Sequence, residues 1–205
     1  MNVLIKRKRI DQKLKRNIRI SKYIIYKETL IDFKEHFWSF IGAFFGIGLI
    51  AFLQSCSLNK MDNIFLIGSF GASSVLVFGA IQSPMAQPRN LIVGHVISGI
   101  IGVTIVKLLP DIIWITAPLA VATSIIMMQI TKSLHPPGGA TALIAVTGTV
   151  KLKALGYFYV IVPVLTGTLI LFLTALIFNN MTSHRKYPTS SKLTKHLKLT
   201  LGFKK

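Results

Sequence analysis

The sequence of 205 residues contains little cysteine and little acid. Cys56 is the single cysteine, so no disulfide can form within the chain and no cysteine cluster is available for a metal. Only 6 residues are acidic against 24 Lys and Arg, which gives a net charge of +18. The phosphate-binding pattern G-x-x-x-x-G-K-[ST] is missing too, and this argues against ATP-driven pumping by this chain alone.

Charged side chains are missing from long stretches of the sequence. Lys, Arg, Asp and Glu are absent from the runs 36–59, 63–88, 90–106, 112–131, 133–150 and 154–184. A spanning helix needs about 20 apolar residues, and five of these runs are long enough or nearly so. The part of the remaining run that can be helical, 138–150, covers only about 20 Å. We therefore predict an all-α, polytopic transmembrane bundle with five long spans and one short span broken by Pro and Gly.

Positive charge is concentrated near the two ends of the chain. Of the 24 basic residues, 11 lie before His36 and 7 lie after Asn180. The positive-inside rule explains this better than nucleic-acid binding does. We expect a basic cytoplasmic arm over 1–35, a membrane domain over 36–180 and a basic cytoplasmic tail over 181–205. Six crossings place 20 basic residues inside and 4 outside, whereas a re-entrant 138–150 gives 15 against 9, so we favour six crossings.

Two proline-containing elbows interrupt the apolar runs. In the second, Pro136 and Pro137 lack backbone donors and end any helix arriving near His135, while Gly138 and Gly139 permit a close backbone approach. A new helix starting there is expected to leave its first amides unpaired. The first elbow, 83–90, has the same character and ends in Arg89 and Asn90.

The two elbows are related by a shift of 49 residues, which lays 63–88 onto 112–137. Both runs lack charge and end in Pro. This weak hydropathy repeat suggests two parallel span–elbow–span units, an arrangement known in transporters.

Several polar residues lie inside the predicted spans. Ser69, Ser73 and Ser74 either bond within the bundle or form a polar lining, and the sequence leaves both readings open. His95 is more often a packed residue than a ligand, although ionisable residues in a membrane favour function. Arg89 either marks topology at the headgroups or shares an anion with the helix amides. We place Asp62 and Asp111 in loops, so that no carboxylate lies within a span.

Three segments carry a family resemblance. Residues 65–78, Ser83–Asn90 with Gly94 and His95, and 135–142 (His-Pro-Pro-Gly-Gly-Ala-Thr-Ala) resemble the signature segments of the HPP family of integral membrane proteins. The likeness runs from Trp38 to Asn180. It implies a transporter-like membrane domain, usually described with four spans, and nitrite transport is associated with plant plastid and cyanobacterial members.

The functional prediction is a transporter or channel for a small inorganic anion, nitrite being the candidate that the resemblance implies. The expected setting is the inner membrane of a bacterial cell, with the lipid bilayer and the anion as partners. We expect no nucleic acid and no cofactor; a homo-oligomer is compatible with so small a chain.

A structural or regulatory subunit is the alternative. An enzyme is disfavoured because no acid orients the two histidines, and a His95–His135 metal pair lacks a third ligand. The predicted substrate-binding residues are Arg89, Asn90, His135, Pro136, Pro137, Gly138, Gly139, Thr141, Ser69, Ser73, Ser74 and His95; we predict no catalytic residue and no metal ligand.

Overall fold

The computed structural model describes residues 33–56, 58, 60–182 and 185–189, apart from the side chains of Ile64, Phe65 and Ile67. Most of the predicted basic arm and most of the predicted tail therefore lie outside the described residues. The chain divides into two units, residues 1–37 and 38–205, and the architecture below is that of the second.

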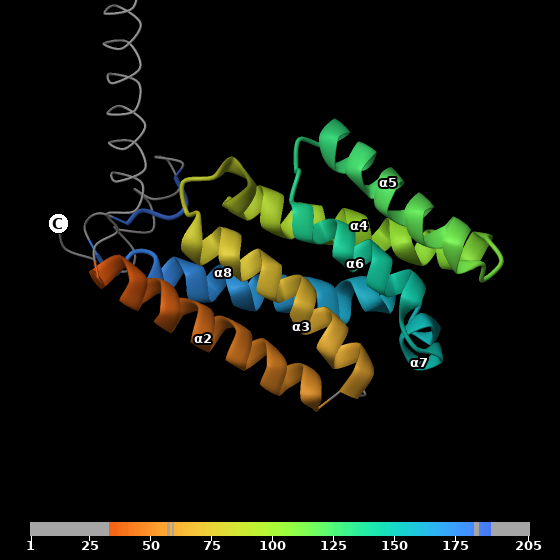
Figure 1. Cartoon of the computed structure of the whole chain (residues 1–205), viewed down its shortest axis with the longest axis horizontal. Coiled ribbons are helices and arrows are strands. Elements are labelled where there is room, and N and C mark those ends of the chain that lie inside the picture. Colours follow the sequence, from red (N-terminus) through yellow and green to blue (C-terminus); the bar gives the residue numbers. More distant parts are fainter. Residues whose placement is uncertain (1–32, 57, 59, 183–184, 190–205) are drawn as a thin grey trace, which may run out of the picture. The chain divides into compact units, whose positions relative to one another are not determined.

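The described elements are all helical (Figure 1). The membrane-length ones are α2 (Phe33–Ser55), α3 (Lys60–Ser74) with the π-helical turn η1 (Val75–Gly79), α4 (Pro88–Leu108), α5 (Ile113–Ile130), and the π-helical turn η3 (Val160–Leu165) with α8 (Thr166–Phe178). The shorter ones are the 3₁₀ turn η2 (Pro84–Ala86), α6 (Pro136–Thr147) and α7 (Val150–Ala154). Five helices are long and apolar enough to cross a membrane, which confirms the predicted polytopic bundle.

Helices α4 and α6 run parallel and lie almost backbone to backbone. A Cβ added at Gly102 would lie 2.6 Å from Ala142 O, and one added at Gly138 would lie 3.0 Å from Gly94 O. Pairing of 94 with 138 and of 102 with 142 means that both helices point the same way. Small residues permit this close approach. In lipid the hydrophobic effect does not drive helices together, so van der Waals packing of this kind drives their association. Helix α5 covers the pair, with Met128 beside Ser98 and Gly94.

The short helix α6 begins inside the bundle. Its third residue, Gly138, lies beside Gly94, which is six residues after α4 starts, so the first residue of α6 lies about 6 Å deeper than the first residue of α4. At the other end Thr149, just after α6, donates its backbone N–H to Asp62 at the start of α3. Twelve residues therefore suffice to reach the far side. This geometry favours six traverses, with both elbows on one side.

Helices α2 and α8 pack in antiparallel fashion beside α3. Two of the three closely spaced glycines of α2 lie in this interface: Gly46 lies against Leu171 and Thr174, and Gly42 against Phe178 and Phe78. Gly48 faces open space, with no atom within 4 Å of an added Cβ. The interface is therefore narrower than the spacing of the three glycines indicates.

Asp62 corrects one sequence-based expectation. It was placed in a loop, but it lies in the first turn of α3 and is only 1% exposed. Both of its carboxylate oxygens accept hydrogen bonds from Thr149, one from the backbone and one from the hydroxyl. A carboxylate thus does lie within a candidate span, and its observed partner is the turn that precedes α7.

The segment 185–189 packs onto the elbow side of the bundle. Arg185 is 4% exposed and donates to Phe78 O, Asn179 Oδ1 and Ser39 Oγ. Tyr187 is buried and donates its hydroxyl to Ala86 O in the first elbow, and this burial raises the pKa of Tyr187. Residues 185–189 therefore belong to the packed bundle.

The α4–α6 contact predicts a position-specific response to a methyl group. Gly102→Ala must push α4 from α6, because the new Cβ meets a backbone oxygen and the Ala145 methyl group. We expect a loss of about 1–3 kcal/mol, seen as a lower thermal unfolding midpoint of the purified protein in detergent. Gly48→Ala is the matched control and should leave that midpoint unchanged or raise it. Equal midpoints for the two variants would contradict the close contact.

Candidate functional site

Five polar side chains meet in the interior between α3, α4 and α6. They are each at most 2% exposed and form what we call the His–Ser network: Ser69, Ser73, His95, His135 and Thr141. Helix α3 supplies the two serines and α4 supplies His95, whereas His135 immediately precedes α6 and Thr141 lies in its second turn. All five are among the residues that the sequence singled out.

Ser73 stands at the centre of the network. Its Oγ lies 2.8 Å from His95 Nε2 and 2.9 Å from His135 Nε2, so that one hydroxyl bridges the two rings. The ring centroids of the two histidines are 4.9 Å apart. The third neighbour of Ser73 is Ser69 O, one helical turn earlier, at 3.3 Å.

The outer bonds of the network reach both elbows and η3. His95 Nδ1 lies 2.6 Å from Thr141 Oγ1, and His135 Nδ1 lies 2.8 Å from Met85 O in the first elbow. Ser69 Oγ lies 3.0 Å from both Thr141 Oγ1 and Pro137 O. The Tyr159 hydroxyl, next to η3, donates to Thr141 O. The elbows and the ends of three long helices are thus connected through one buried set of bonds.

One arrangement of hydrogens satisfies all four ring nitrogens when both histidines are neutral. Met85 O only accepts, so His135 Nδ1 must donate, and His135 Nε2 then accepts from the Ser73 hydroxyl. Ser73 Oγ in turn accepts from His95 Nε2–H, and His95 Nδ1 accepts from Thr141. Every ring nitrogen is satisfied in this arrangement, so no charge is needed to hold the network together.

The same groups have room for one further proton. If the Ser73 hydroxyl turns to Ser69 O, Ser73 Oγ is free to accept from both Nε2 atoms, and His135 becomes an imidazolium. Among the described residues, the hydrogen-bond partners of the two histidines are hydroxyls and a carbonyl, with no carboxylate. A buried imidazolium here would need a negative charge from outside the network.

The expected bare amides of the second elbow are not what the structure shows. Pro136 and Pro137 occupy the first two positions of α6 and have no N–H, and the Gly138 N–H donates to His135 O at 2.8 Å. The close approach is made by Gly138, not Gly139: an added Cβ at Gly139 finds only Val121 Cγ1, at 3.8 Å. The elbow provides close packing for the histidines, while its first turn offers few free donors.

Three further predicted residues lie outside the His–Ser network. Arg89 is exposed and donates to Thr131 O at 2.9 Å, and Asn90 donates to Leu134 O at 2.8 Å, so both tie the first elbow to the second. Ser74 bonds back to Gly71 O on its own helix. Among the described residues, no group of three or more His, Cys, Asp or Glu is placed to hold a metal.

Sequence reasoning missed Tyr159 and the carbonyl of Met85. A backbone carbonyl leaves no trace in residue identity, and Tyr159 lies in a run that reads as one long span. Gly94 was noted only as part of a motif, yet an added Cβ there would lie 2.7 Å from His135 Cβ. The adjacency of Gly94 and His95 was therefore the available signal that α4 touches the second elbow.

The fold and the buried network define an integral membrane protein of the polytopic helical class. Residues 28–188 match the HPP transmembrane region, and the chain belongs to this family. Two relatives from Dictyostelium discoideum, each described only as a transmembrane protein, are 45% and 44% identical over 163 and 160 residues. Each alignment covers 77% of this chain but only 51% and 56% of the relative, so the chain spans about half their length. No solved structure matches it.

The central role of Ser73 leads to a prediction about stability. Ser73→Ala leaves the Nε2 atoms of two buried histidines without their common partner, which should cost about 1–3 kcal/mol. Ser74→Ala is the neighbouring control, because that hydroxyl serves only its own helix. The unfolding midpoint of the purified protein should fall for Ser73→Ala and change little for Ser74→Ala. A similar midpoint in both variants would remove Ser73 from the centre of the network.

Proposed function

We propose that this protein is a transporter or channel for a small inorganic anion, with nitrite as the first candidate. The observation that carries the proposal is the bridged histidine pair, buried in a helical membrane domain and hydrogen-bonded without a carboxylate. A site of this composition has no negative charge of its own to repel an anion.

Helix direction supports an anion over a cation. Because α4 and α6 are parallel and both begin on the elbow side, the positive ends of their dipoles face the same region, where His135 lies. Arg89 adds a full positive charge at the exposed surface of that side. An anion arriving there is attracted by Arg89 and then meets the positive end of α6.

The spare proton position supports coupling of the anion to a proton. A neutral network can take up one proton on His135 when Ser73 reorients, and the resulting cation is stabilised by the anion that accompanies it. The anion and the proton then cross the membrane together without net charge. Nitrite, the anion of a weak acid, suits such a step, and the family resemblance points to the same ion.

The alternative is a structural or regulatory membrane subunit. The observation in its favour is that both ring nitrogens of each histidine already have partners and that neither ring is exposed. If the histidines always keep these hydrogen-bond partners, the His–Ser network serves only to pack the helices together. The bacterial inner membrane and the cytoplasmic position of both termini are further parts of the proposal.

The test of transport is flux in proteoliposomes containing the purified chain. Nitrite, nitrate, formate and chloride are compared with and without a pH gradient, and we expect nitrite uptake that increases when the trans side is alkaline. Uptake of none of the four ions would support the structural reading. Conversion of any of them into another compound would indicate an enzyme.

A paired variant assigns the flux to the network. Thr141→Val keeps the shape of the side chain but removes the hydroxyl that His95 and Ser69 contact, and nitrite flux should fall by about tenfold or more. Thr147→Val, on the same helix, removes an exposed hydroxyl that bonds only to Leu143 O. Flux that is normal in Thr141→Val, or lost equally in both variants, would separate transport from this site.

Arg89 is tested by the concentration dependence of the same flux. Arg89→Gln removes the charge but keeps a donor for Thr131 O, so the nitrite concentration for half-maximal flux should rise more than the maximal rate falls. An unchanged half-saturation concentration would exclude Arg89 from the entry path.

A further inference from the structure

A second polar feature lies away from the His–Ser network, at the opposite end of α2 from the elbows. Gln54, the penultimate residue of α2, is 6% exposed, and neither its amide nitrogen nor its amide oxygen has a hydrogen-bond partner within the described part of the chain. An unpaired buried amide costs about 1–3 kcal/mol and is rare. The position of Gln54 therefore calls for a partner that the described residues do not supply.

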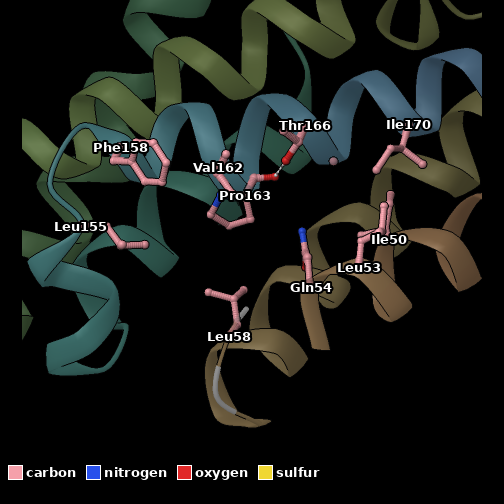
Figure 2. A pocket seen from close by; sticks show the side chains of 11 residues that line it. Ile50, Leu53, Gln54, Leu58, Leu155, Phe158, Val162, Pro163, Thr166 and Ile170 are labelled. Carbon is pink, nitrogen blue, oxygen red and sulfur yellow. Dashed lines mark hydrogen bonds between the residues drawn. The ribbon is translucent and has the colours of Figure 1, made fainter. Parts of the chain in front are cut away.

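A cavity of about 460 Å³ adjoins this amide, between α2, the segment before η3, and α8. Figure 2 shows the Gln54 side chain pointing from α2 into the space below Pro163 and Thr166. We call this the Gln54 cavity. Its other lining residues are Ile50, Leu53, Leu58, Leu155, Phe158, Val162, Pro163, Thr166, Gly167 and Ile170.

The lining determines the kind of ligand that fits. Apart from Gln54 and Thr166 the wall is apolar, and the Thr166 hydroxyl already donates to Pro163 O. No lining residue is charged, so an ionised head group would be buried without a counter-ion. The volume falls within the range typical of small-molecule sites. The cavity thus suits an apolar body with one uncharged polar group.

The Gln54 amide narrows the choice of that polar group. A carboxamide presents a donor and an acceptor side by side, and a primary amide or an undissociated carboxylic acid satisfies both at once in a cyclic pair. An ester or a ketone satisfies only the donor. Gln54 lines the cavity, but its two amide atoms are covered in the structure, so a ligand reaches them only after the side chain changes rotamer.

We propose that the Gln54 cavity binds a membrane amphiphile whose head group is an uncharged primary amide or an undissociated carboxylic acid. Its hydrocarbon chain lies along Phe158, Val162 and Ile170, and its head group pairs with Gln54. The position near the end of a spanning helix places the head group close to the membrane boundary, which is where amphiphile head groups lie. The argument for this ligand does not rest on the proposed anion transport.

The experiment is photolabelling of the whole purified chain in lipid nanodiscs with a diazirine-bearing dodecanamide, followed by peptide mapping. Label should concentrate in peptides containing residues 50–58 and 155–170. Unlabelled dodecanamide should compete about tenfold better than methyl dodecanoate, which has no donor for the Gln54 oxygen. Dodecanoic acid should compete better at about pH 4 than at about pH 8, and this arm distinguishes an acid from an amide ligand.

Three variants assign the label to the cavity. Gln54→Leu has nearly the same volume and should reduce specific labelling by about tenfold. Val162→Phe should reduce it by occupying the cavity while leaving Gln54 intact. Gln129→Leu makes the same change at an exposed glutamine of α5 and should leave labelling unchanged.

The stability of the variants provides a second readout. Gln54→Leu removes an unpaired buried amide, so without ligand its unfolding midpoint should equal or exceed that of the parent chain, and dodecanamide should raise the midpoint of the parent only. Equal labelling in the parent chain and Gln54→Leu, equal competition by amide and ester, or label spread evenly over the lipid-facing helices would each overturn the proposal.

Discussion

The structure depends on the absence of side chains where α4 meets α6. Gly94, Gly102 and Gly138 let the two helices lie so close that an added methyl group would meet backbone oxygen at each of the three positions. This contact brings His95 and His135 to a centroid separation of 4.9 Å, within reach of the single hydroxyl of Ser73. In lipid, where apolar surface gains nothing by leaving the solvent, packing of this kind and interhelical hydrogen bonds are the available sources of helix association. The glycines therefore allow the close approach of α4 and α6, and this approach places the two histidines within hydrogen-bond distance of Ser73.

The fold was more accessible from the sequence than the site was. Absence of charge over about 20 residues can only mean burial in lipid or protein, so the positions of the long helices followed within a few residues. The elbows followed from proline, which has no donor and a fixed φ. The missing N–H of proline also explains why the expected unpaired amides at the start of α6 are not found. Pro136 and Pro137 end the preceding helix and at the same time remove the donors that an anion would need. The N–H of Gly138 is used by His135 O. Asp62 was misplaced because sequence position suggests a loop, whereas its burial depends on Thr149, which lies 87 residues away. Contacts of that range leave no local pattern.

Two polar features of the membrane domain differ in how far their hydrogen bonds are satisfied. The His–Ser network has a partner for every ring nitrogen, and a hydroxyl at Ser73 with three neighbours gives it two alternative arrangements of hydrogens. The Gln54 amide has no hydrogen-bond partner among the described residues, and its side chain borders a cavity. A bundle selected only for packing gains little from either, because apolar residues of similar volume fill a core at lower desolvation cost. The first kind is suited to moving a proton, and the second is suited to holding a molecule that enters from the bilayer.

Phe70 lies between these two features. Its ring packs directly against Gly167 in the wall of the Gln54 cavity, and its centroid is 5.3 Å from that of His95. Gly167 and Phe70 therefore link the wall of the cavity to His95 through van der Waals contacts, with no polar group between. A rigid ring in van der Waals contact on both sides transmits displacement rather than charge. If the cavity influences the histidines, the influence must act through the position of the His95 ring relative to Ser73 and Thr141, which are its hydrogen-bond partners in the network. Those two bonds are 2.8 and 2.6 Å long, so a shift of the ring changes their lengths directly, and the strength of a hydrogen bond depends on this geometry.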